Sequence, residues 1–240
     1  MIMHPSRDDA ARRSAFASMV AHELRTPLTA AFAALEMMAG GAPDAGSYAA
    51  RDAMLIGLAH RNTLRLLRIV EDCLDLEAAS DDRLTLQRAQ LDSGDLVALG
   101  VDGARCAREQ TGVDVLLHLD ALRPLVGDRL RLGRALTHLV QNAVTFAPPG
   151  TVVTVTTSDV AERDAVRFAV EDRGAGIEPQ QLRALFQRFD VREAPGRRRV
   201  GGLGMGLAFV RTIAELHGGT VQASSEPGHT TIAFEVPAMA

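Results

Sequence analysis

Apolar residues recur every three or four positions along the first third of the chain, which is the spacing of one face of an α-helix. In the first segment the repeating positions are Phe16, Val20, Leu24, Leu28, Ala31 and Leu35. In the second segment they are Met54, Leu58, Asn62, Leu66, Ile69, Cys73 and Leu76. The stretch AGGAPDAG between them, residues 39–46, is a turn rich in Gly and Pro, and Ser47 is placed to cap the next helix. The pattern predicts two long helices between residues 9 and 79, joined as an antiparallel hairpin.

One such hairpin covers only one face of each of its helices. Two hairpins that pack against each other make a four-helix bundle, in which both apolar faces are covered. We therefore expect the chain to form a homodimer through this helical region.

The pattern changes after residue 82, where strand-like runs begin to alternate with helical ones. The predicted strands cover residues 113–119, 151–157, 165–172, 220–225 and 230–237. The predicted helices cover residues 92–108, 128–146 and 204–217. This order predicts an α/β sandwich with a mixed sheet rather than repeated βαβ units. We expect two domains, a helical one over residues 1–81 and an α/β one over residues 82–240.

Composition removes several classes of protein. The net charge of −4 argues against general binding of nucleic acid or of an anionic membrane. All 26 basic residues are arginine, which excludes mechanisms that need a lysine, such as a P-loop or a Schiff base. Cys73 and Cys106 stand apart in apolar helical contexts, and we interpret both as free thiols. No apolar run approaches the ~20 residues that span a bilayer, and the first residues do not resemble a signal peptide. We therefore expect a soluble, cytoplasmic chain.

The window VAHELRTPLTAA, residues 20–31, contains reactive polar side chains and a proline that disfavours a regular helix. At 100° per residue, His22 lies about 200° from the apolar positions on either side of it and faces away from the stripe. Glu23 can hold one ring nitrogen of His22 and leave the other as a nucleophile. Thr26 lies one turn later on the same face as His22. Pro27 removes a backbone N–H and is expected to bend the helix. A zinc metalloprotease motif is excluded because Thr26 occupies the place of its second histidine.

Three further stretches are candidates for ligand binding. They are GDRLRLGRALTHLVQNAVTFA at residues 127–147, EDRGAGI at 171–177 and VGGLGMGLAFV at 200–210. Each alone is weak, because Gly-rich stretches are usually turns and a helical Asn is usually solvated. A dinucleotide-binding motif is excluded for the third stretch, since its spacing is G-x-G-x-G and no strand leads into it.

The stretch HELRTPL resembles the phosphoacceptor box of sensor histidine kinases. The three Gly- and Asn-containing stretches, with ALFQRF at residues 184–189, resemble the N, G1, G2 and F boxes of the ATPase family shared by histidine kinases, gyrase and a heat-shock chaperone. The resemblance covers about residues 12 to 236. It implies a dimeric HisKA-type bundle followed by a Bergerat ATP-binding fold.

The resemblance also implies a reaction. His22 would take the γ-phosphate of ATP with help from Glu23, and the phosphoryl group would pass to an aspartate of a response regulator. Thr26 would position a water for dephosphorylation of the regulator.

For the nucleotide, the resemblance implies that Asn142 holds Mg²⁺, that Asp172 accepts from the adenine amino group, and that Gly-rich backbone approaches the ligand. The implied contacts are Asn142, Phe146, Asp172, Gly174, Gly176, Ile177, Arg188, Phe189, Gly202, Gly204, Met205, Gly206 and Leu207. Residues 190–203 would form a mobile lid. Thr145 stands where the family usually has a basic residue, and we assign that charge to Arg188. His138 stands where the family often has Asn.

Two other readings compete with a kinase. A histidine phosphotransfer or scaffold protein with a decayed ATP domain would keep His22, but such domains typically lose the Gly-rich boxes that this chain retains. A foldase or topoisomerase-like ATPase would have no use for the HELRTPL hairpin. The autophosphorylating kinase is the reading that uses every motif.

Overall fold

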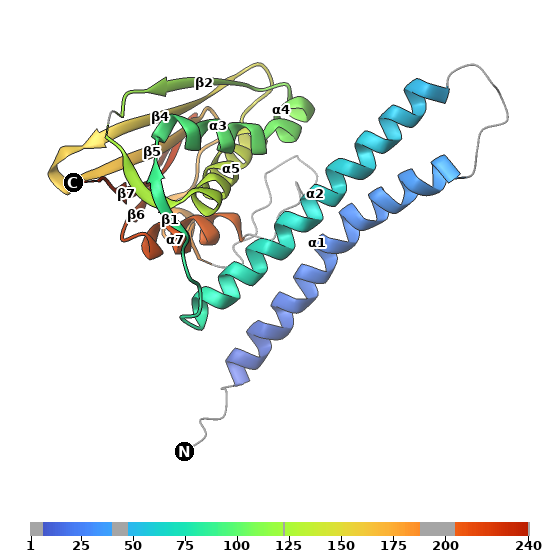
Figure 1. Cartoon of the computed structure of the whole chain (residues 1–240), viewed down its shortest axis with the longest axis horizontal. Coiled ribbons are helices and arrows are strands. Elements are labelled where there is room, and N and C mark those ends of the chain that lie inside the picture. The colour runs from blue at the N-terminus through green and yellow to red at the C-terminus, as the bar shows by residue number, and fades with distance from the viewer. Residues whose placement is uncertain (1–6, 40–47, 122, 188–204, 240) are drawn as a thin grey trace. The chain divides into compact units, whose positions relative to one another are not determined.

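The structure is a computed structural model that describes residues 7–39, 48–121, 123–187 and 205–239. It separates into two compact units, Met1–Glu77 and Ala78–Ala240 (Figure 1). Each unit is described by itself below.

The first unit consists of the long helix α1 (Arg7–Ala39) and all but the last three residues of the long helix α2 (Tyr48–Ser80). Both predicted helices are confirmed, and α1 continues through Pro27, whose side chain is buried. The predicted turn at 39–46 and the predicted cap at Ser47 lie outside the described residues, apart from Ala39. A small apolar cluster ties the two helices together, and it consists of Ala34, Leu55 and Ala59 with Met38 and Leu58 packed against them.

Much of the apolar surface of this hairpin is uncovered in the single chain. Of the predicted stripes, Ala31 and Leu76 are buried, whereas Leu28, Leu35 and Met54 are 57%, 55% and 71% exposed. Other large apolar residues exposed on the two helices are Phe32, Met37, Ile56, Leu64, Leu67, Val70 and Leu74. Exposed apolar surface on this scale typically marks an interaction site.

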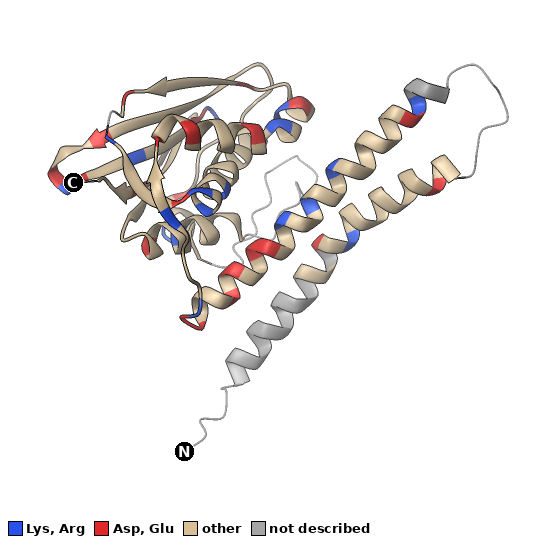
Figure 2. Cartoon of the chain, in the orientation of Figure 1, with Lys and Arg blue, Asp and Glu red and all other residues tan. Residues whose placement is uncertain are grey.

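None of the described helices is long and apolar enough to cross a membrane. Charged residues occur in both helices of the hairpin, as the coloured parts of the ribbon in Figure 2 show.

Cys73 on α2 should react unusually slowly in the folded chain. Burial, together with the neighbouring carboxylates of Asp72 and Glu77, raises the pKa of its thiol from 9.0 to about 11. Because the thiolate is the reactive form, a shift of this size lowers the reactive fraction near pH 8 by roughly 100-fold. Alkylation by iodoacetamide in a Cys106→Ser variant, followed with and without denaturant, would measure this. Equal rates in the folded and unfolded chain would contradict the prediction.

The second unit contains a five-stranded mixed sheet in the order β2-β4-β5-β7-β6. Its strands are β2 (Asp114–Leu119), β4 (Val152–Val160), β5 (Ala165–Asp172), β6 (Thr220–Glu226) and β7 (His229–Pro237). β2 pairs with β4 in parallel, and the other pairs are antiparallel. All five strands predicted from the sequence are therefore present, and no end differs by more than three residues.

Helices cover one face of this sheet (Figure 1). They are α3 (Ser93–Gly103), α4 (Arg105–Thr111), α5 (Arg129–Phe146) and α7 (Gly206–Leu216). Between helices and sheet lies the core, in which Phe168 of β5 and Phe234 of β7 stack with ring centroids 5.0 Å apart. The alternation of buried residues along β5, from Val166 to Asp172, places every second side chain in this core.

The structure corrects the sequence prediction at three places. The single helix expected over residues 92–108 is two helices, α3 and α4, which meet at the buried Ala104. Two short strands, β1 (Arg88–Leu91) and β3 (Leu125–Asp128), pair antiparallel and were not predicted. A short helix α6 (Pro179–Leu182) and the 3-10 turn η1 (Ala161–Arg163) were also missed.

Candidate functional site

The motif HELRTPL lies within α1. Glu23 is mostly buried, with 14% of its side chain exposed, and its Oε2 lies 3.5 Å from Nη2 of Arg65 on α2. Thr26 is exposed, one turn beyond position 22. The side chain of His22 lies outside those that the structure describes, so its predicted outward orientation stays a prediction. Arg65 was missed because it comes 42 residues after Glu23 and carries no local signal.

In the second unit, Asp172 ends β5 and is the polar centre of the candidate nucleotide site. Only 4% of its surface is exposed, and its Oδ1 accepts a hydrogen bond from the amide of Gly174 at 2.7 Å. Burial raises the pKa of the Asp172 carboxyl, while the bond from Gly174 acts in the opposite direction. A carboxylate can accept more bonds than this one, so Asp172 keeps capacity for a ligand donor.

The turn after Asp172 has no room for larger residues. A Cβ on Gly174 would lie 2.6 Å from Oδ1 of Asp172 and 3.0 Å from the carbonyl oxygen of Phe146. Gly176 has a φ of +86°, and a Cβ there would lie 2.8 Å from the carbonyl oxygen of Glu226. Both glycines therefore follow from close backbone approach. Phe146, at the end of α5, is partly exposed beside this turn.

Two hydroxyls that the sequence analysis missed complete this end of the sheet. Thr230 pairs with Asp172 in the β5–β7 register and is buried. Its Oγ1 lies 2.8 Å from Oγ of Ser225, which accepts from the amide of Ile177 at 2.8 Å. The cross-strand register brings these residues together, and only the Thr/Ser content of SSEPGHTT hinted at them.

Helices α5 and α7 run antiparallel, with the start of α7 against His138 and its end beside the start of α5. Gly206, the first residue of α7, packs against His138 of α5, and a Cβ there would lie 2.9 Å from its Nδ1. His217, directly after α7, bonds to Asp128 directly before α5. Asn142 is one turn beyond His138 and is partly buried.

The first turn of α7 is suited to bind an anion. Its N-cap residue, Met205, is buried and makes no side-chain cap bond. Amides at such a helix start favour a negative group because they lack intrahelical partners and the helix dipole adds to the attraction. Gly206 and Leu207 belong to this turn.

Several predicted residues cannot be placed. Arg188, Phe189, Gly202 and Gly204, together with the expected lid over 190–203, lie outside the described residues. Across the described ranges, no group of three or more His, Cys, Asp or Glu side chains could hold a metal ion. Asn142 offers one amide oxygen, a hard ligand of the kind that Mg²⁺ accepts beside the phosphates of a nucleotide.

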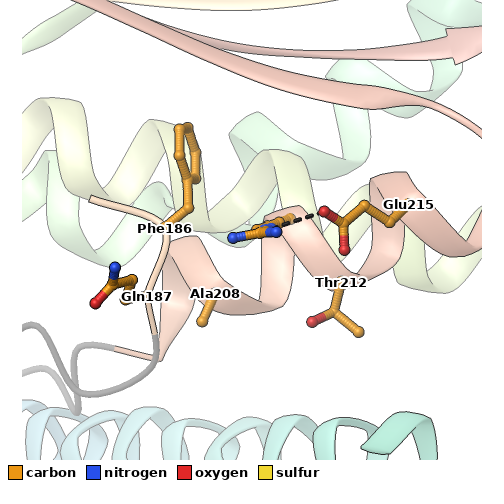
Figure 3. A pocket seen from close by; sticks show the side chains of 6 residues that line it. Phe186, Gln187, Ala208, Thr212 and Glu215 are labelled. Atoms are coloured by element: carbon orange, nitrogen blue, oxygen red, sulfur yellow. Dashed lines mark hydrogen bonds and ion pairs between the residues drawn. The ribbon is translucent and has the colours of Figure 1, made fainter. Parts of the chain in front are cut away.

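A cavity of about 300 Å³ lies elsewhere, along one side of α7 (Figure 3). It is lined by Phe186, Gln187, Ala208, Arg211, Thr212 and Glu215. Arg211 and Glu215, which both line it, form an exposed ion pair of 2.7 Å. None of the predicted nucleotide residues that the structure describes lines this cavity, so it is separate from the site at Asp172.

Comparison with known proteins follows the same two-part division. Residues 12–81 match the family described as His Kinase A (phospho-acceptor) domain. Residues 127–240 match the family described as Histidine kinase-, DNA gyrase B-, and HSP90-like ATPase. The predicted helical region followed by an α/β sandwich of the Bergerat type is thereby confirmed.

Individual relatives cover nearly the whole chain. The sensor histidine kinase WalK of Bacillus subtilis (strain 168) is 30% identical over 233 residues, which are 94% of this chain and 36% of that protein. The probable sensor histidine kinase TcrY of Mycobacterium tuberculosis (strain ATCC 25618 / H37Rv) is 34% identical over 227 residues, 92% of this chain and 45% of that protein. The structure of full-length ShkA in complex with AMPPNP has the same fold, with a TM-score of 0.64 at 24% identity over 95% of this chain and 46% of that one.

The chain thus spans less than half the length of these relatives. Both family matches occur in the order expected for a kinase core, and their residues include the HELRTPL helix and the site at Asp172. This chain belongs to the sensor histidine kinases of two-component systems.

Proposed function

We propose that this chain is an ATP-dependent kinase core that phosphorylates its own His22 and passes the phosphoryl group to an aspartate of a response regulator. Residues 1–81 would serve as the dimerisation and phosphoacceptor domain, and residues 82–240 as the ATP-binding domain. The observation that carries the proposal is the buried Asp172, which accepts from the amide of Gly174 in a turn packed against the end of α5. The presence of an ATP analogue in the ShkA structure supports the choice of nucleotide.

Each half of the site has a distinct role in nucleotide binding. Asp172 would accept from the amino group of adenine, which a guanine does not present in the same position. The phosphates would lie at the first amides of α7, those of Gly206 and Leu207. Asn142 would hold Mg²⁺, which supplies positive charge to the β- and γ-phosphates during transfer.

The transfer itself is a displacement at phosphorus. An unprotonated ring nitrogen of His22 attacks the γ-phosphorus, the bond to the bridging oxygen breaks, and ADP leaves. Glu23 would accept a hydrogen bond from the other ring nitrogen and so fix the tautomer. Arg65, which lies 3.5 Å from Glu23, keeps a positive charge beside that carboxylate.

A second copy of the chain is the expected partner of the hairpin. The uncovered apolar residues lie on both α1 and α2, and a four-helix bundle would cover them. Sedimentation or light scattering of the purified chain would measure this, and a monomer at micromolar concentration would contradict it.

Incubation of the chain with γ-labelled ATP and Mg²⁺ tests the proposed function. A phosphohistidine is labile to acid and stable to base, so we expect protein-bound label with that profile. Release of free phosphate without protein-bound label would instead indicate a simple ATPase. Label that appears only when a second kinase is added would indicate a phosphotransfer protein.

Thr26 is expected to act in the reverse reaction, removal of phosphate from the regulator. Its hydroxyl lies on an exposed face one turn from position 22, where it could orient a water for attack on a phospho-aspartate. Thr26→Ala should leave labelling of His22 near normal and selectively slow loss of phosphate from the regulator. The matched control is Thr63→Ala, since Thr63 is an exposed threonine of α2. Parallel loss of both activities and of thermal stability in Thr26→Ala would indicate a structural role.

A further inference from the structure

His217, at the end of α7, is a buried histidine with a defined hydrogen-bond state. Only 3% of its surface is exposed. Its Nε2 lies 2.9 Å from the backbone nitrogen of Asp128, and its Nδ1 lies 2.7 Å from the carbonyl oxygen of Ile213. Because a backbone amide can only donate, Nε2 must be unprotonated, and Nδ1 carries the ring hydrogen that Ile213 accepts. The ring is therefore neutral in this arrangement.

The partner of His217 holds together two other segments. Asp128 is the N-cap of α5, and its Oδ1 accepts from the amide of Arg131 at 3.1 Å. Its Oδ2 accepts from the amide of Gln87 at 3.0 Å and from the guanidinium of Arg131 at 2.6 Å. Although burial alone would raise the pKa of Asp128, these bonds lower it, so the carboxylate stays charged. The start of α5 and the segment that enters β1 are thus fixed by one side chain.

A second hydrogen bond joins β1 to the end of α7 beside His217. Arg88, the first residue of β1, donates to the carbonyl oxygen of Leu216 at 2.9 Å and so caps the end of α7. The ring of His217 lies against Gly127, where a Cβ would be 3.2 Å from Nε2. The segments at 87–88, 127–128 and 216–217 therefore meet around His217, and its ring cannot shift without moving one of them.

A proton on Nε2 would break this arrangement. It would place an N–H against the N–H of Asp128, and two donors cannot bond each other. The charged groups that face the ring from neighbouring elements are Arg88 on β1, Asp128 before α5 and Arg131 on α5. Two of the three are cations. Burial lowers the pKa of His217, and the two arginines lower it further, although the hydrogen bond to Ile213 and the charge of Asp128 partly oppose them.

The direction of the pH effect follows from this. An unfolded histidine titrates near pH ~6.5, above the pKa of His217 in the closed arrangement. The stability that the bond to Asp128 contributes is therefore fully present above the pKa of an unfolded histidine. It is lost as the pH falls through the lower pKa of His217.

We propose that His217, Asp128, Gln87 and Arg88 form a proton-sensitive latch, in which protonation of Nε2 releases the Asp128 amide and loosens both the first turn of α5 and the entry to β1. Since α5 also carries Asn142, opening should weaken nucleotide binding. That consequence rests on the proposed function, whereas the latch itself does not.

Hydrogen exchange of the full chain without nucleotide tests the latch. Protection, corrected for the intrinsic pH dependence of exchange, is measured by mass spectrometry between about pH 7.5 and about pH 5. Peptides over 84–91 and 125–132 should lose protection by about tenfold per pH unit once the pH is below the midpoint of His217 protonation. Peptides over β5 and β7 should keep their protection over the same range. His217→Gln should remove this pH dependence, because its amide oxygen can accept from Asp128 and does not titrate. The control His118→Gln, at an exposed position of β2, should keep it.

An unchanged pH profile in His217→Gln, or constant protection of 125–132 in the natural sequence, would overturn the latch. If the variant does not fold, nuclear magnetic resonance of the natural chain decides, since the His217 ring and the Asp128 amide must titrate with one midpoint. Arg88→Gln should move that midpoint to higher pH, because it removes a cation near the ring. ATP affinity measured over the same pH range distinguishes the latch from its effect on nucleotide binding. If hydrogen exchange changes with pH and ATP affinity does not, only the proposed effect on nucleotide binding is contradicted.

Discussion

Replacing His22 with glutamine should abolish transfer of label from γ-labelled ATP to the chain. Glutamine offers no nucleophilic nitrogen, so the loss is expected to be complete rather than partial. Nucleotide affinity should be unchanged because the proposed nucleotide residues lie in the second unit. Self-association should be unchanged because His22 is predicted to face away from the apolar stripe of α1. Labelling, calorimetry with ATP and light scattering measure the three properties.

A matched histidine provides the control. His60 is exposed on α2 of the same unit, and His60→Gln should label like the natural chain. Glu23→Gln should label more slowly by about 10²–10⁴-fold, the usual contribution of a positioned acid–base partner. Persistent base-stable label in His22→Gln would place the acceptor at another residue.

The second large effect is expected at Asp172. In Asp172→Asn the remaining oxygen can still accept from the amide of Gly174, so the turn should keep its shape. The ligand-facing side changes from an acceptor to a donor. A bond to a charged group contributes roughly 1.5–3 kcal/mol, so ATP affinity should fall by roughly 10- to 100-fold. Discrimination against GTP should also relax, and calorimetry with both nucleotides measures the two changes.

Two neighbouring variants sharpen this prediction. Glu171→Gln alters the adjacent carboxylate, which faces the opposite side of β5 and pairs with Arg173 and His229, and ATP affinity should not change. Asn142→Asp should reduce phosphotransfer more than nucleotide affinity, because it alters the proposed Mg²⁺ ligand. Unchanged ATP affinity after Asp172→Asn would place the purine pocket elsewhere.

The elements that the sequence predicted well are those with a long local pattern. β5 alternates buried and partly exposed residues over the seven positions from Val166 to Asp172, and α1 and α2 each run for 33 residues. β1 and β3 have four residues each and form only because they pair with each other across more than thirty residues, Leu91 with Leu125. Nothing in four residues such as RAQL distinguishes a strand from a loop.

The break between α3 and α4 also depends on residues far away in the sequence, those of α5. Gly100 packs so closely on α5 that a Cβ would lie 2.5 Å from Cβ of Leu136, and Gly103 makes an equally tight approach to Thr137. The chain turns at Ala104 while these contacts hold α3 against α5. A helical pattern over 92–108 contains no information about that neighbour.

The candidate site divides in the same way. Asp172, Gly174 and Gly176 were predictable because the whole turn is encoded in seven consecutive residues. Arg65 beside Glu23, Ser225 beside Ile177, and His217 beside Asp128 are separated by 42, 48 and 89 residues. Helix pairing and strand register bring these partners together, so they could be identified only from the three-dimensional structure.

Locating the phosphoryl group by mass spectrometry tests the central claim most directly. The chain would be incubated with ATP and Mg²⁺, digested at neutral or basic pH and fragmented by a method that preserves the phosphorus–nitrogen bond. The account predicts one phosphoryl group on the peptide that carries HELRTPL, at His22, and none when ATP is replaced by an analogue that cannot be cleaved at the γ-phosphate. A phosphoryl group on any other residue, or ATP consumption with no modified peptide, would contradict it.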